Sequence, residues 1–100
     1  MERSILYKAQ TMRNMELEYY IIIDDTHFGG CEGYGARIIK TEYGVKSEKC
    51  IESSQVNNIF YKRFDIEKFM EILVCNEVTP MSLKDITEDY IEDRLYGTII

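Results

Sequence analysis

The spacing of apolar residues changes character once along this 100-residue chain, close to residue 65. From there the apolar side chains recur every third and fourth residue, at Ile66, Phe69, Met70, Leu73 and Val74. This spacing places them on one face of a helix. We expect Asp65 to cap the start of that helix and Asn76 to end it.

A second helix is expected directly after the first. Thr79 precedes Pro80, and a proline at the first helical position loses no backbone hydrogen bond. A second apolar stripe follows, at Leu83, Ile86, Tyr90 and Ile91. Gly97 is suited to the C-terminal end of this helix. The last third of the chain is therefore predicted to be helical.

The residues before this point favour β-strands. Strands are expected near residues 4–12 and 15–24, joined by a tight turn at Arg13 and Asn14. The run Tyr19–Ile23 is apolar without alternation, which suits a strand covered on both faces. A third strand is expected over about 34–42 and a fourth over about 45–53, with a turn near Tyr43 and Gly44.

Residues 54–63 show no clear period and are expected to cross from the sheet to the helices. Strands followed by helices predict an α+β fold, because the helices then gather on one face of an antiparallel sheet. We expect a four-stranded antiparallel meander followed by two helices packed on one face (ββββαα), with residues 1–100 forming a single domain.

The composition is that of a chain that folds on its own, with 45% apolar and 30% charged residues. The longest apolar run is far shorter than the roughly 20 residues that span a bilayer, and the first residues do not resemble a signal peptide. The three cysteines, Cys31, Cys50 and Cys75, are not closely spaced, which favours reduced thiols. These features predict a cytoplasmic protein without a membrane partner.

The negative charge is concentrated in the predicted helices. Residues 1–64 hold equal numbers of acids and bases, so the whole net charge of -6 falls in residues 65–100. On the second helix, acids recur at helical spacing opposite the apolar stripe, at Asp85, Glu88, Asp89, Glu92 and Asp93. Such a face is either simply solvated or a contact for a basic protein surface. A pI near 4.8 argues against direct binding of nucleic acid.

A second candidate site is the glycine-rich segment around His27 and Cys31. Histidine and cysteine are zinc ligands, and Asp24 and Asp25 lie nearby, but zinc needs four ligands. A hairpin turn at Gly44 would place Cys50 opposite about Ile38 and too far from Cys31 to share an ion. A zinc site would need Cys75, an aspartate or a second copy of the chain.

Catalysis is not expected from this sequence. His27 is the only histidine, and Cys31 has no neighbouring cation to activate its thiol, whereas Glu32 would raise the thiol pKa. The glycines match no phosphate-binding motif. We therefore expect no cofactor, with zinc as the alternative, and a cysteine-dependent enzyme as the less favoured version of that alternative.

The segment Phe69–Leu95 resembles the C-terminal signature of a small-protein family of unknown function found in clostridia and related Firmicutes. The resemblance is carried by Asn76, Val78-Thr79-Pro80, Leu83, Asp85-Ile86 and Glu88-Asp89-Tyr90-Ile91, and it extends to Tyr19-Tyr20 and Tyr34-Gly35. That family has no assigned activity to carry over, and the Gly-Gly-Cys loop departs from its pattern.

The chain is more loosely similar to phage-borne anti-CRISPR proteins, which are small, acidic and rich in tyrosine. RNA-guided nucleases hold nucleic acid in basic channels, which an acidic surface can block. The resemblance implies an inhibitor that binds a basic surface of such a nuclease. The alternative is a zinc-organised regulatory module at His27 and Cys31. The oligomeric state stays open, a homodimer included.

Overall fold

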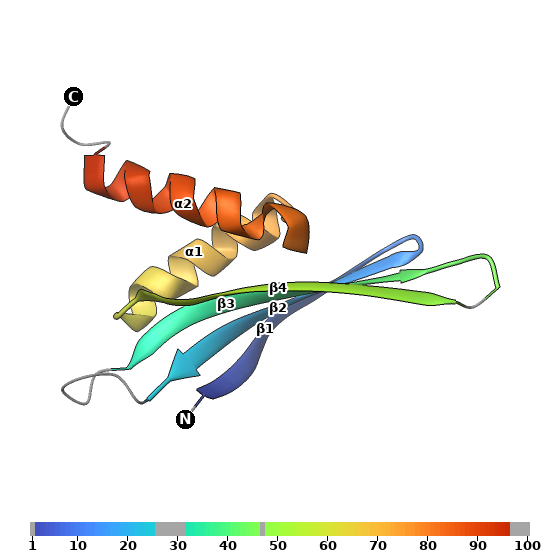
Figure 1. The fold of residues 1–100 in the computed structure, drawn as a ribbon, viewed down its shortest axis with the longest axis horizontal. Helices are drawn as coiled ribbons and strands as arrows, with labels where there is room; N and C mark the ends of the chain where they lie inside the picture. Colours follow the sequence, from blue (N-terminus) through green and yellow to red (C-terminus); the bar gives the residue numbers. More distant parts are fainter. Residues whose placement is uncertain (1, 26–31, 47, 97–100) are drawn as a thin grey trace.

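The computed structural model describes residues 2–25, 32–46 and 48–96, and Figure 1 shows their arrangement. Four strands precede two helices: β1 (Glu2–Met12), β2 (Met15–Asp24), β3 (Gly33–Tyr43), β4 (Lys49–Phe60), α1 (Arg63–Cys75) and α2 (Pro80–Tyr96). The strands form one antiparallel sheet in the order β1-β2-β3-β4. Both helices lie on the same side of this sheet (Figure 1). The predicted ββββαα meander is therefore confirmed.

The β1–β2 hairpin turns where the sequence predicts. Met12 pairs with Met15, and Arg13 takes the left-handed conformation (φ 39°) that a two-residue turn needs. The pairing of β1 with β2 shifts by one residue between Leu6 and Lys8, where Tyr7 is the extra residue of a β-bulge. This bulge changes which residues of β1 face the helices, because side chains alternate along a strand.

The middle of β2 is buried on both faces of the sheet, as its unbroken apolar run predicts. Tyr19, Ile21 and Ile23 belong to the core beneath the helices, which we call the core face. Ile22 points to the opposite, outer face and is nevertheless only 2% exposed. There it lies across from Gly35, and Gln55 of β4 hydrogen-bonds Glu2 of β1 at 2.7 Å on the same face.

The fourth strand differs from its predicted range of 45–53. It begins four residues later and continues to Phe60, so most of the segment expected to leave the sheet is in fact part of β4. Cys50 pairs with Glu42 and not with a residue near Ile38. The prediction was wrong because all residues of 53–58 except Val56 are polar and of low strand propensity, and the pairing of 53–56 to β3 overrides that propensity.

Gly33 and Gly35 lie inside β3, which begins one residue before its predicted range of about 34–42. A Cβ atom at Gly35 would overlap the backbone carbonyl oxygen of Val56, and one at Gly33 would overlap the side chain of Asn58. The backbones of β3 and β4 therefore approach each other closely at the register shift between Tyr34 and Ala36.

The first helix buries the predicted stripe, with Ile66, Phe69, Met70 and Leu73 as its buried residues. Its start differs from the prediction, because Lys62 is the N-cap residue and Asp65 lies within the first turn. The side chain of Lys62 makes no capping hydrogen bond. A carboxylate in the first turn still interacts favourably with the helix dipole.

The first helix ends at Asn76, as predicted, in a Schellman motif. Val78 N–H donates to Leu73 C=O, and Glu77 N–H donates to Val74 C=O. Glu77 takes the left-handed conformation (φ 50°) that usually favours glycine. This tight reversal brings Val78 into the core and leads directly to Pro80, the first residue of α2.

Aromatic rings join the two helices to the sheet. The centroids of Phe69 and Tyr90 are 5.0 Å apart, and Phe60 lies within 5.8 Å of both. In α2, Leu83 is fully buried and Ile86 and Tyr90 pack partly against the core. Gly97, the predicted end of α2, lies outside the described residues. Neither described helix offers a long enough apolar stretch to cross a membrane.

Candidate partner-binding surface

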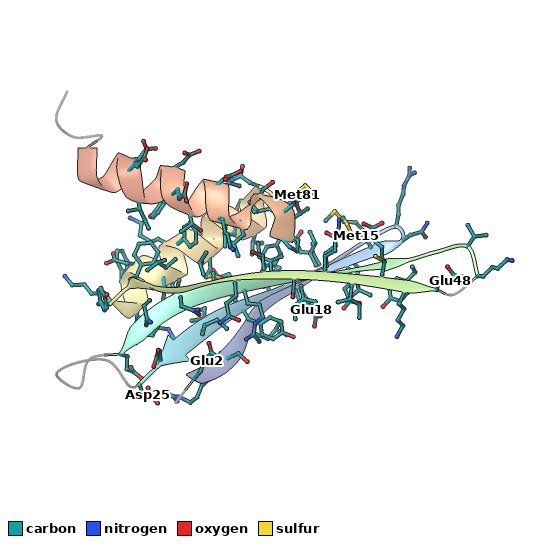
Figure 2. The ribbon with its side chains drawn as sticks, in the orientation of Figure 1. Glu2, Met15, Glu18, Asp25, Glu48 and Met81 are labelled. Carbon is teal, nitrogen blue, oxygen red and sulfur yellow. The ribbon has the colours of Figure 1, made fainter. Side chains whose placement is uncertain are left out.

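The candidate surface is the face of α2 that points away from the core. Exposed residues recur every three or four positions along α2 and together form this face. Carboxylate oxygens project from it away from the sheet (Figure 2). All the acids predicted for a partner contact are exposed: Asp85, Glu88, Asp89, Glu92 and Asp93. We call these five residues the acidic stripe. The opposite face of α2 is buried by Leu83 and Thr87, so the sheet fixes the direction in which the stripe points.

The acidic stripe is not neutralised within the described part of the chain. The ion pairs there join Arg3, Lys40 and Arg63 to acids of the sheet and of α1, and none involves α2. Lys84 is exposed one turn before Glu88, but it forms no ion pair with a described residue. Like charges spaced three or four residues apart repel by about 0.2–0.5 kcal/mol per pair. The stripe therefore opposes helix stability.

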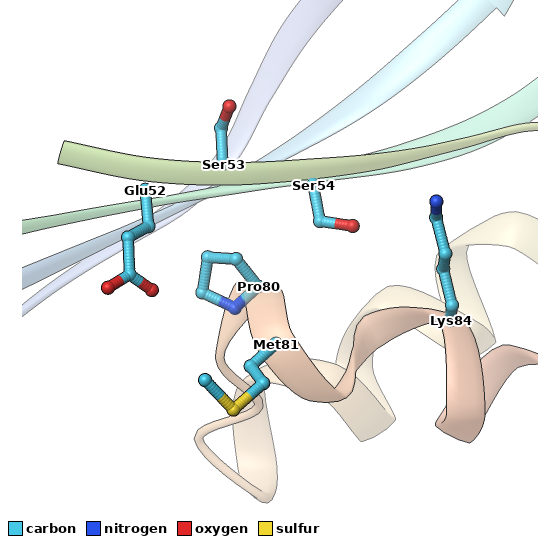
Figure 3. A pocket seen from close by; sticks show the side chains of 6 residues that line it. All are labelled: Glu52, Ser53, Ser54, Pro80, Met81 and Lys84. Atoms are coloured by element: carbon cyan, nitrogen blue, oxygen red, sulfur yellow. The ribbon is translucent and has the colours of Figure 1, made fainter.

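A hollow of about 420 Å³ lies at the N-terminal end of the same helix, between α2 and β4. Figure 3 shows its lining: Glu52, Ser53, Ser54, Pro80, Met81 and Lys84. Met81 is 83% exposed and lies one turn before Asp85, so the exposed face of α2 begins with an apolar side chain and continues as acids. The sequence did not predict this hollow, because it forms only where α2 packs beside β4.

The alternative metal site cannot be assembled from the described residues. His27 and Cys31 both lie outside them, so their part in a site stays a prediction. Cys50 and Cys75 are exposed, one in β4 and one at the end of α1. Within the described ranges, no group of three or more histidine, cysteine or acidic side chains could hold a metal ion.

Two acids that flank the glycine-rich segment are already paired. The guanidinium of Arg3 contacts Asp25 at 3.2 Å and Glu32 at 2.9 Å. Glu32 also accepts a hydrogen bond from the Tyr34 hydroxyl at 3.0 Å. Burial and this carboxylate raise the pKa of Tyr34. The cluster ties the ends of β1, β2 and β3 together, and a metal that recruited Asp25 or Glu32 would compete with Arg3.

The model of one protein family matches nearly the whole chain. The model of DUF6514, a family of unknown function, matches residues 1–93. The chain belongs to this family. The DUF6514 match covers the whole sheet, α1 and the entire acidic stripe of α2. No curated protein and no solved structure matches the chain.

Proposed function

We propose that this DUF6514 chain is a non-catalytic protein-binding module whose acidic stripe contacts a basic surface of a partner. One observation carries the proposal: five exposed carboxylates follow one face of α2, and no described base pairs with them. An arrangement that destabilises its own helix is more readily explained by a contact than by folding. Such a stripe would speed encounter with a basic partner and set its orientation.

Three groups of the sheet have raised pKa values. Burial and Glu77 raise the pKa of Tyr19 to about 12, the hydrogen bond from Tyr20 to Glu18 raises the pKa of Tyr20, and the hydrogen bond to Glu42 raises that of Lys40. These groups stay protonated at neutral pH, and the proposal does not depend on their titration.

The more specific form of the proposal is an anti-CRISPR-like inhibitor, encoded by a phage or a clostridial host, that binds an RNA-guided nuclease. The nuclease channel is positively charged, so an acidic helix can occupy the place of the nucleic-acid backbone. Met81 and the hollow beside it would add an apolar contact at one end of the stripe. The proposed contact is with the protein surface of the nuclease and not with nucleic acid.

The test is a charge reversal with a matched control. The stripe variant carries Glu88→Lys, Asp89→Lys and Glu92→Lys, and the control carries the same change at Glu48, Glu71 and Glu77, which are exposed outside α2. The readout is the association rate with a guide-loaded RNA-guided nuclease at several salt concentrations, after a pull-down from host lysate has supplied further candidate partners.

Reversal of the stripe should slow association by about tenfold or more at low salt, and the loss should shrink as salt is added. The control variant should bind within a factor of about three of the wild type. Equal effects of the two variants would show that only net charge matters, and unchanged binding by the stripe variant would refute the proposal.

A further inference from the structure

We draw no further inference here: the strongest candidate, the exposed face of α1 that bears Phe64, Ile72 and Cys75 and an apolar hollow of about 280 Å³, carries no proposal because nothing in the structure shows what covers it.

Discussion

Tyr19 connects the sheet to the reversal between the two helices, and its removal should have an effect that depends on pH. The side chain is fully buried in β2, and its hydroxyl donates a hydrogen bond to the Val78 carbonyl at 2.9 Å. Burial, together with the charge of Glu77, raises the pKa of Tyr19 from 10.0 to about 12. Tyr19→Phe removes the hydroxyl and leaves a buried carbonyl without this donor.

At pH 8 both the folded and the unfolded chain keep this hydroxyl protonated, so the variant should lose only the hydrogen bond. A buried carbonyl that loses its donor costs about 1–3 kcal/mol of unfolding free energy. Above pH 10 the unfolded chain releases the proton while the folded chain retains it until about pH 12. Wild-type stability should therefore fall by about 1.4 kcal/mol per pH unit in this window, from this group alone.

The assay is urea unfolding of wild type, Tyr19→Phe and Tyr7→Phe at pH 8, 10 and 11, followed by circular dichroism. The other tyrosines are common to all three chains, so the stability difference isolates one hydroxyl. The difference between wild type and Tyr19→Phe should shrink by roughly 1 kcal/mol from pH 10 to pH 11. Tyr7, which is 37% exposed, serves as the control for removal of a tyrosine hydroxyl, and Tyr7→Phe should change the free energy of unfolding only slightly at pH 8. A pH-independent difference for Tyr19→Phe would refute the reasoning.

Three further substitutions are expected to change the free energy of unfolding, each measured by urea denaturation. Glu77→Gly should stabilise the chain by about 1 kcal/mol, because glycine relieves the left-handed backbone (φ 50°) at the end of α1; a destabilised variant would contradict the Schellman geometry. Glu92→Lys should stabilise the chain by about 1 kcal/mol, because it replaces the repulsion of Glu92 by Glu88 and Asp89 on α2 with two attractive contacts. Glu92→Gln should give about half of that gain. No gain from either variant would mean that the stripe does not oppose folding. Gly35→Ala should destabilise by about 3 kcal/mol, because the new methyl group overlaps the Val56 carbonyl; a neutral result would show that β3 and β4 are not so closely spaced.

The helices could be predicted because their signal is local. The spacing of Ile66, Phe69, Met70 and Leu73 identifies the buried face of α1 without knowledge of what covers it. The start of α1 could not be predicted in the same way. Asp65 is a suitable cap, but the helix begins at Arg63, only three residues after β4 ends at Phe60. The end of that strand is decided by pairing to β3, which residues 54–60 do not reveal by composition.

The candidate surfaces also differ in whether a local sequence pattern predicts them. The acidic stripe was visible in the sequence because it repeats at helical spacing, and its exposure followed from the apolar residues on the other face of α2. The hollow beside Met81 and the β-bulge at Tyr7 were not visible, because each depends on which elements become neighbours. The Tyr7 bulge in particular is a property of strand pairing and has no signature in the sequence.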